Sequence, residues 1–182
     1  LQTLLSTTNN RYTALFTEVP SNPLLQTPDV AKLRALADAH DFALVVDDTI
    51  GNFANIDMLG NNNDNHTPAA DLVCTSLTKL FSGRGDAMAG SLIVNPHTTI
   101  GQQIQQDLEN IRSLEQQQQQ DCMDNNNHYD TTDLFSADAW AMYYNSQDFL
   151  ERNDRINETS EQLCDWLKQH PDVQTIYYPK YT

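Results

Sequence analysis

Four short apolar segments along the chain have the length and composition of β-strands. They are TALFTE, FALVV, DLVCTS and SLIVN, which occupy residues 13–18, 42–46, 71–76 and 91–95. The second of them is apolar without alternation, as is usual for a strand that is buried on both faces of a parallel sheet. We therefore expect these segments to form one mostly parallel sheet.

Three longer segments carry apolar residues at the spacing of an α-helix. We expect helices at residues 27–40, 98–114 and about 148–167, the first with Thr27 as its N-cap and Pro28 at its first helical position. The third ends before His170–Pro171 because proline cannot continue a helix. Strands that alternate with helices in this way predict an α/β fold. The positions expected to face the interior are Val30, Leu33, Leu36, Ala37, Ile100, Ile104, Leu108, Ile111, Phe149, Ile156, Leu163 and Leu167.

Two segments of low complexity interrupt this pattern. They lie at about 60–68 and 115–131, are rich in Asn and Gln, and hold too little apolar surface to offset the entropy of ordering them. Because the pattern on either side reads as a single α/β alternation, we interpret them as surface insertions within one domain spanning 1–182. The chain starts at Leu1 and ends just after IYYPK, which reads as a strand, so we expect a longer protein whose C-terminal region starts near 172–182.

The net charge of the chain argues against some classes of binding partner. The 182 residues include 25 acidic and 10 basic side chains, a formal net charge of −15 at pH 7. Because phosphate binding needs a basic face, this balance argues against nucleic acid and anionic membrane as partners. No apolar run approaches the ~18 residues that a membrane helix needs. Cys74, Cys122 and Cys164 show no metal-binding spacing and are interpreted as reduced thiols of a cytoplasmic protein.

Polar residues follow each of the first three expected strands. Glu18, Ser21 and Asn22 come after the first strand, Asp47–Thr49 after the second, and Ser76–Lys79 after the third. In open α/β sheets, ligands bind beyond the carboxyl ends of the strands. We therefore expect these side chains to converge if the three strands are neighbours.

A lysine beside hydroxyls and a carboxylate is the set of groups that pyridoxal phosphate requires. The lysine amine forms a Schiff base with the cofactor aldehyde, a carboxylate keeps the pyridine nitrogen protonated, and hydroxyls bind the phosphate. Taken singly, each residue has a simpler interpretation: Lys79 as a solvated lysine at a strand end, Asp47 as a turn or cap residue, and Ser76 and Thr78 as turn formers. A Rossmann-like nucleotide site is a weaker alternative, because G-x-G-x-x-G follows none of the strands. No metal site is predicted.

Taken with their spacing, these residues resemble the pyridoxal-phosphate enzymes of cysteine and methionine metabolism, the family of the trans-sulfuration enzymes. The resemblance rests on FTEVPSNPLLQTPDVAKL, VVDDTIGNFAN, ADLVCTSLTKLFSGRGDAMAGSLIVNP and FLERNDRINETSEQLCDWLKQHPDVQTIYYPK. The DDTIGNFAN and SLTKLFSG variants are most similar to fungal cystathionine γ-synthases. The resemblance implies part of a fold type I (aspartate-aminotransferase-like) large domain, with flanking helices and an antiparallel strand near Ser91–Val94. It also implies segments that this chain lacks, among them the aromatic residue that stacks on the cofactor and the arginine that binds the substrate carboxylate.

The resemblance implies a role for each candidate residue. Lys79 is the Schiff-base lysine and the general base, and Asp47 pairs with the pyridine nitrogen. Ser76 and Thr78 bind the cofactor phosphate, and Asn22 contacts the phenolic oxygen of the ring. Glu18 is expected at most to support these residues, without contacting the cofactor itself. Ala89 stands where the family usually has glycine, which predicts a local adjustment of the backbone.

The resemblance also implies a reaction. The expected activity is γ-replacement, in which an activated homoserine ester and cysteine give cystathionine, by a homo-oligomeric enzyme. A cystathionine β- or γ-lyase and an O-acetylhomoserine sulfhydrylase are the alternatives within the same chemistry. An inactive paralogue that acts only as a partner subunit is the alternative of another class.

Overall fold

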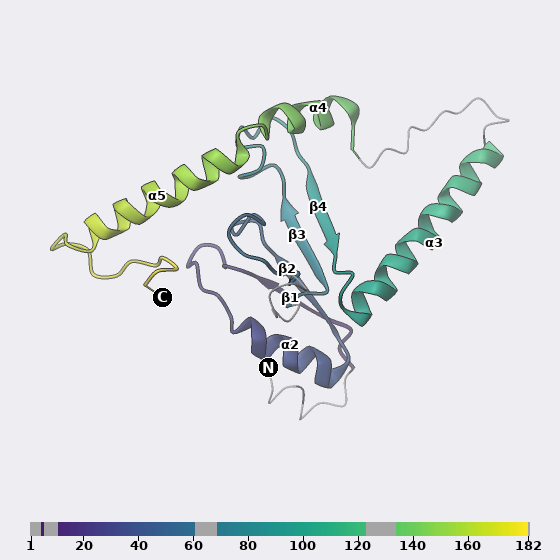
Figure 1. The fold of residues 1–182 in the computed structure, drawn as a ribbon, viewed down its shortest axis with the longest axis horizontal. Helices are drawn as coiled ribbons and strands as arrows, with labels where there is room; N and C mark the ends of the chain where they lie inside the picture. Colours follow the sequence, from purple (N-terminus) through teal and green to yellow (C-terminus); the bar gives the residue numbers. More distant parts are fainter. Residues whose placement is uncertain (1–4, 6–10, 61–68, 123–133, 182) are drawn as a thin grey trace.

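The computed structural model describes residues 5, 11–60, 69–122 and 134–181, which form a four-stranded sheet with helices around it (Figure 1). The strands are β1 (Ala14–Glu18), β2 (Ala43–Asp47), β3 (Leu72–Ser76) and β4 (Gly90–Val94), and their order in the sheet is β1-β2-β3-β4. β1, β2 and β3 are parallel, and β4 is antiparallel to β3. The predicted strands, the mostly parallel sheet and the antiparallel strand near 91–94 are therefore confirmed.

Helix α2 (Val30–His40) connects β1 to β2 and lies against one face of the sheet (Figure 1). The prediction of Thr27 as its N-cap was wrong. Asp29 caps the helix, because its carboxylate accepts a hydrogen bond from the backbone amide of Lys32 at 3.1 Å and satisfies one of the free amides of the first turn. At the other end Asp41 adopts the left-handed conformation and closes the helix.

The hydrophobic core lies between α2, the sheet and the loop that follows β2. Its buried members come from all three, and partly buried residues of α2 pack against them. These buried members are Val19, Ala37, Phe42, Leu44, Val46, Met58, Ala70 and Val73. The prediction of an interior β2 is confirmed by these burials, and so is the inward face of the first helix.

The helices that follow the sheet are α3 (Thr99–Cys122), α4 (Ser136–Asn145) and α5 (Phe149–Leu167). Helix α3 continues into the glutamine-rich segment that was predicted to be an insertion, because glutamine is a good helix former and each further residue adds a backbone hydrogen bond. Residues 123–131 of that segment and 61–68 of the other lie outside the described residues. The pattern analysis did not predict α4.

Most of the expected inward faces of α3 and α5 are not buried. Ile111 is 51% exposed, Ile156 40% and Leu163 52%, whereas Phe149 in the first turn of α5 is buried. Figure 1 shows the reason, since both helices contact the sheet region at one end and project away from it along the rest of their length. The apolar positions of α3 and α5 indicated helices correctly, but the prediction that most of these positions are buried was wrong.

The C-terminal tail returns along α5 and does not form the strand that IYYPK suggested. Its residues have no regular secondary structure in the described part of the tail. Lys180 bonds to Asp165 of α5 at 3.2 Å and also contacts Glu161, so side-chain ion pairs hold the tail in place of a sheet ladder. In the described part of the chain, none of the helices has the length and apolarity to span a bilayer.

Candidate functional site

The three parallel strands end at a common edge of the sheet, and this edge carries most of the candidate residues. Glu18 at the end of β1 is paired in register with Asp47 at the end of β2, and Asp47 is paired with Cys74 of β3. Ser76 is the last residue of β3. The sheet therefore brings Asp47 and Ser76 to one edge, as expected for the carboxyl ends of adjacent parallel strands.

Thr49 links these two residues. Its backbone amide donates to Asp47 Oδ1 at 2.9 Å, and its hydroxyl oxygen accepts a hydrogen bond from the Ser76 amide at 2.9 Å. This arrangement uses one oxygen of the Asp47 carboxylate, while Oδ2 accepts no hydrogen bond from a described residue. The Ser76 hydroxyl likewise has no hydrogen-bond partner among the described residues.

The side chain of Thr78 links the two ends of the loop between β3 and β4 by hydrogen bonds. Its hydroxyl oxygen accepts a hydrogen bond from the Ala89 amide at 3.0 Å, and its nearest acceptor is the Ala89 carbonyl at 3.4 Å. Because that second contact is long, the hydroxyl proton is only weakly engaged and is available to another acceptor. Ala89 is not among the described residues with positive φ, so alanine fits the backbone conformation at this position.

Lys79 lies in a tight turn directly after β3. Its amide donates to the Ser76 carbonyl at 3.3 Å, and its own carbonyl accepts from the Gly83 amide at 2.7 Å. Gly83 closes the turn with φ of +75°, a conformation that suits glycine. The Lys79 residue is exposed, so the conformation of this turn decides where its amine is presented.

Asn22 lies in the loop after β1, and its side chain makes no hydrogen bond to the other candidates among the described residues. Its backbone amide donates to Glu18 Oε2 at 3.0 Å, and the residue is exposed. Glu18 thus supports the loop that carries Asn22. The amide of Val19 donates to the Asp47 carbonyl at 3.0 Å, which keeps the start of this loop beside the end of β2.

Asp48 is buried directly beside the Asp47 carboxylate and was not among the predicted site residues. Its Oδ2 accepts a hydrogen bond from the Phe53 amide at 2.6 Å, whereas its Oδ1 has no partner among the described residues. Burial raises the pKa of Asp48 to about 6; the Phe53 amide opposes this rise, and the charge of Asp47 adds to it. A β-carbon at position 51 would lie 1.9 Å from Asp48 Oδ1, so Gly51 is needed for the loop to close over this carboxyl.

Thr49 belongs to the polar cluster predicted after the second strand but was given no role, although it follows Asp47 in the D-x-T pattern of a side-chain turn. Two further residues of the site were not predicted. Asn145 and Arg152 bond to the loop that carries Lys79 from α4 and α5. No short-range pattern marks them, since their partners lie more than 60 positions away along the chain.

The groups at this edge fit pyridoxal phosphate. Asp47 Oδ2 is an acceptor for a protonated ring nitrogen, the Ser76 and Thr78 hydroxyls have protons to donate to phosphate oxygens, and the exposed Lys79 carries the amine. Burial of Cys74, together with the nearby Asp47 charge, raises the pKa of its thiol and keeps it neutral beside these groups. Cys74 and Cys164 are free thiols.

The chain is similar to enzymes of sulfur amino-acid metabolism. The family model described as Cys/Met metabolism PLP-dependent enzyme matches residues 1–182. A cystathionine gamma-synthase of Neurospora crassa is 42% identical over 171 residues, which are 94% of this chain and 23% of that protein. An alanine racemase of Aspergillus violaceofuscus is 42% identical over 158 residues, covering 85% of this chain and 22% of that protein.

A solved structure shares the fold. The cystathionine gamma-lyase of Lactobacillus plantarum, crystallised with L-serine, superimposes with a TM-score of 0.63 at 24% identity, over 97% of this chain and 39% of that one. The chain spans less than a quarter of the length of the two curated relatives named above. The shared fold confirms the predicted α/β architecture, and the family match confirms the predicted cofactor. The chain belongs to the Cys/Met metabolism PLP-dependent enzyme family.

Proposed function

We propose that this protein is a cystathionine γ-synthase, which joins cysteine to an activated homoserine ester. The observation that carries the proposal is the convergence of Asp47, Ser76 and the Lys79 turn at one sheet edge, in a chain 42% identical to a fungal cystathionine gamma-synthase. In the reaction the cysteine sulfur forms a bond to the γ-carbon of the ester substrate. The γ-carbon–oxygen bond breaks, the acid of the ester leaves with the thiol proton, and cystathionine remains.

Each residue of the edge has a proposed task in this reaction. Pyridoxal phosphate, when bound, supplies the electron sink that makes the α-proton of the substrate removable. Asp47 holds the ring nitrogen in its protonated form through Oδ2, while Thr49 fixes Oδ1. Ser76 and Thr78 donate to the phosphate. The Lys79 amine would hold the cofactor and, when free, would take the α-proton and return protons to the substrate carbons.

The proton transfers proposed for Lys79 are shared by several reactions of this family. An alanine racemase needs removal and return of the α-proton and nothing further, and one such enzyme is as similar to this chain as the synthase is. A lyase and a sulfhydrylase start in the same way. The roles proposed for Asp47 and Lys79 therefore hold for all of them, and the choice of product depends on contacts beyond this edge.

Product analysis separates these reactions. The protein expressed from its complete reading frame is incubated with O-acetyl- or O-succinylhomoserine and cysteine, and cystathionine is measured by mass spectrometry. Formation of cystathionine supports the synthase. Homocysteine from sulfide indicates the sulfhydrylase, keto acid from cystathionine indicates a lyase, and conversion of L-alanine to D-alanine indicates a racemase.

The Lys79→Ala variant tests the enzyme proposal itself. We expect a visible absorbance band from lysine-bound cofactor in the wild-type protein, which the variant loses together with at least about 10³-fold of the turnover, because both the anchor and the proton carrier are gone. A Lys79→Ala variant with wild-type activity would remove the proposed role of Lys79, whereas a wild-type protein without the band would favour the inactive partner subunit.

The remaining parts of the proposal concern assembly, domain organisation and location. We propose that residues 1–182 form part of the cofactor-binding large domain and that the protein acts as a homo-oligomer in the cytoplasm on amino-acid substrates. Light scattering of the purified protein measures the assembly, and a monomeric mass for an active enzyme would remove that part of the proposal.

A further inference from the structure

Arg152 binds two backbone carbonyl groups of the turn that carries Lys79. The Ser82 amide bonds to the Leu77 carbonyl at 2.9 Å, and the Gly83 amide bonds to the Lys79 carbonyl at 2.7 Å. Leu80 and Phe81 lie within the segments that these two bonds close, and their carbonyl groups accept neither of the two amides. Both accept hydrogen bonds from Nη2 of Arg152, at 3.1 and 2.9 Å.

Arg152 is itself fixed at the start of α5. Its Nη1 is 3.0 Å from Asp148 Oδ1, one helical turn earlier. The guanidinium packs so closely on Gly83 that a β-carbon there would lie 2.9 Å from Arg152 Cζ. Gly83 therefore serves two purposes, the positive φ that ends the turn and the close approach of Arg152.

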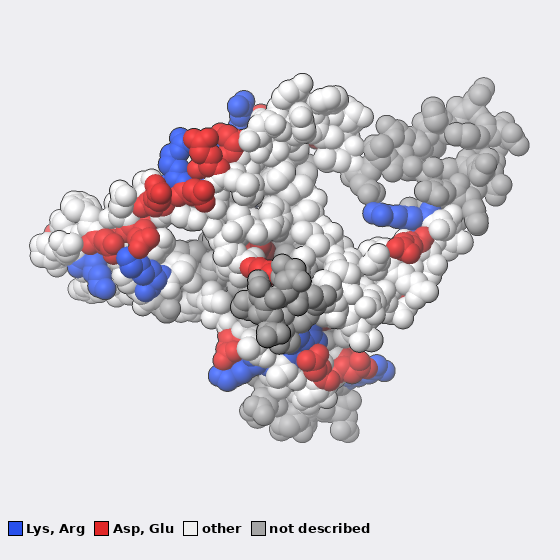
Figure 2. All heavy atoms as spheres, in the orientation of Figure 1, with Lys and Arg blue, Asp and Glu red and all other residues white. Residues whose placement is uncertain are grey.

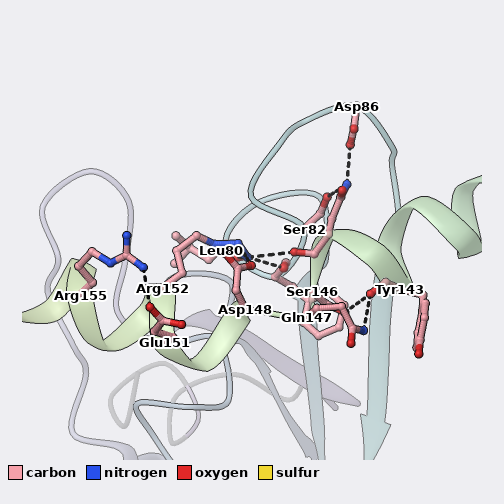
Figure 3. Close-up of polar contacts among 12 residues, drawn as sticks. Leu80, Ser82, Asp86, Tyr143, Ser146, Gln147, Asp148, Glu151, Arg152 and Arg155 are labelled. Carbon is pink, nitrogen blue, oxygen red and sulfur yellow. Dashed lines mark hydrogen bonds and ion pairs between the residues drawn. The ribbon is translucent and has the colours of Figure 1, made fainter.

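Asn145 makes a second connection between the helices and the same loop. Its side-chain amide donates to Ser82 Oγ at 2.9 Å and to Asp86 Oδ1 at 2.8 Å. Asn145 is 6% exposed and Ser82 is fully buried, so the bond between them lies out of water, where losing a partner costs the most, whereas Asp86 is exposed. Figure 3 shows Ser82 and Asp86 on the loop after β3, with Arg152 reaching the same loop from α5.

An aromatic cluster completes the contact. Phe81, Phe149 and Phe53 form a set of three rings, with centroids 5.3 Å apart for Phe81 and Phe149 and 6.3 Å apart for Phe53 and Phe81. Phe81 follows Lys79 by two residues and packs on the first residue of α5. The turn is thus held by charge-assisted bonds, amide bonds and ring packing from the α4–α5 junction, and by the Phe53 ring from the loop after β2.

We propose that Arg152 and Asn145 are positioning residues, which set the conformation of the Lys79 turn so that the lysine amine meets the cofactor aldehyde. The inference rests on the proposed function and deepens it. In that step the amine nitrogen forms a double bond to the aldehyde carbon, and the aldehyde oxygen leaves as water. Because the side chain of Lys79 is exposed, the turn is what orients it, and small displacements of a reacting group have large effects on rate.

The test compares Arg152→Met and Arg152→Lys with Arg155→Met as the matched control. Arg155 lies three residues further along α5 and makes an exposed ion pair with Glu151 at 3.1 Å, without contacting the loop. Each protein, expressed from its complete reading frame, is freed of cofactor and mixed with pyridoxal phosphate. Lysine–cofactor bonds are then trapped with borohydride, and the modified lysine is quantified by peptide mass spectrometry.

We expect Arg152→Met to form the Lys79 adduct about 10-fold more slowly than wild type and to shift the pH midpoint of its absorbance band. The rate of adduct formation in Arg152→Lys should lie between those of wild type and Arg152→Met. The lysine ammonium keeps the positive charge but lacks the planar set of N–H donors of the guanidinium. Arg155→Met should match wild type. Hydrogen exchange should be faster at residues 80–83 in Arg152→Met than in the control.

Wild-type rate and pH midpoint in a folded Arg152→Met variant would overturn the proposal. If that variant does not fold, Asn145→Ser and Arg152→Lys carry the same test, and wild-type behaviour of both overturns it. Absence of the Lys79 adduct in the wild-type protein is a different result, since it removes the cofactor assignment itself and the positioning role with it.

Discussion

At the residue scale, the buried carboxyl group of Asp48 lowers the stability of the folded protein when it must ionise. Its pKa is raised from 3.8 to about 6, chiefly by burial. Below pH 4 the carboxyl is protonated in both folded and unfolded states, and its ionisation adds no cost. As the pH rises from about 4 to about 6, the unfolded chain loses the proton and the folded chain keeps it. The unfolded state is therefore favoured progressively, by up to about 3 kcal/mol in total above pH 6.

Asp48→Asn should remove this dependence on pH. An asparagine oxygen can still accept from the Phe53 amide but has no charge to desolvate. We expect the unfolding free energy of the variant, relative to wild type, to rise by about 1–3 kcal/mol between pH 4 and pH 7 in urea titrations. Asp57→Asn is the control, because Asp57 also accepts backbone bonds in this loop but is exposed to water. A flat difference between Asp48→Asn and wild type would contradict the raised pKa.

At the element scale, a set of asparagine side chains joins the loop after β2 to α5. Asn153 of α5 accepts from Asn52 at 3.0 Å and from Asn55 at 3.2 Å, and it donates to Asn55 at 3.0 Å. Asn153 is buried, so Asn153→Ala leaves buried amide groups without partners and should lower the unfolding free energy by about 2 kcal/mol.

The matched control for Asn153 is Asn157→Ala, one helical turn further along α5. Asn157 makes one bond to Asn55 at 2.8 Å and is exposed, so water replaces its amide when it is removed. We expect a loss below about 1 kcal/mol. Both variants are compared by urea unfolding at one pH. Equal losses would mean that burial of Asn153 does not determine the strength of this connection.

The sequence predicted the elements whose signals are local. The strands and α2 have patterns complete within a few residues, and Asp47 and Ser76 were predicted to converge because parallel strands end at a common edge. Helix α4 was missed because its large aromatic residues Trp140, Tyr143 and Tyr144 are exposed, while its buried residues are Met142 and the polar Asn145, which do not make an apolar stripe. Arg152 and Asn145 were missed because they recognise backbone carbonyls and small polar groups far along the chain, which leave no pattern of their own.

At the scale of the whole molecule, acidic side chains outnumber basic ones. The formal charge is −15, and Figure 2 shows acidic and basic groups intermixed along α5 on the face in view. The ion pairs Asp148–Arg152 and Glu151–Arg155 place the acid four residues before the base, the favourable order on a helix. Such exposed pairs contribute about 0.3–0.5 kcal/mol each and weaken in salt. Salt weakens the repulsion among the excess acidic side chains as well. This second effect stabilises the folded protein, whereas the weakening of the ion pairs destabilises it.

We expect the repulsion to dominate, so that added NaCl stabilises the protein. Between 0.01 M and 0.15 M salt the Debye length falls from about 30 Å to about 8 Å, which screens charges spread over the whole surface. The variant Asp154→Asn/Glu158→Gln tests this cause, because the two exposed acids lie four residues apart on α5 and repel each other. At low salt it should be more stable by about 0.2–0.5 kcal/mol, and it should gain less from NaCl than wild type does. Thermal unfolding at the two salt concentrations measures both effects, with sucrose as the uncharged control. A wild-type protein that loses stability in NaCl would show that its ion pairs outweigh the excess of negative charge.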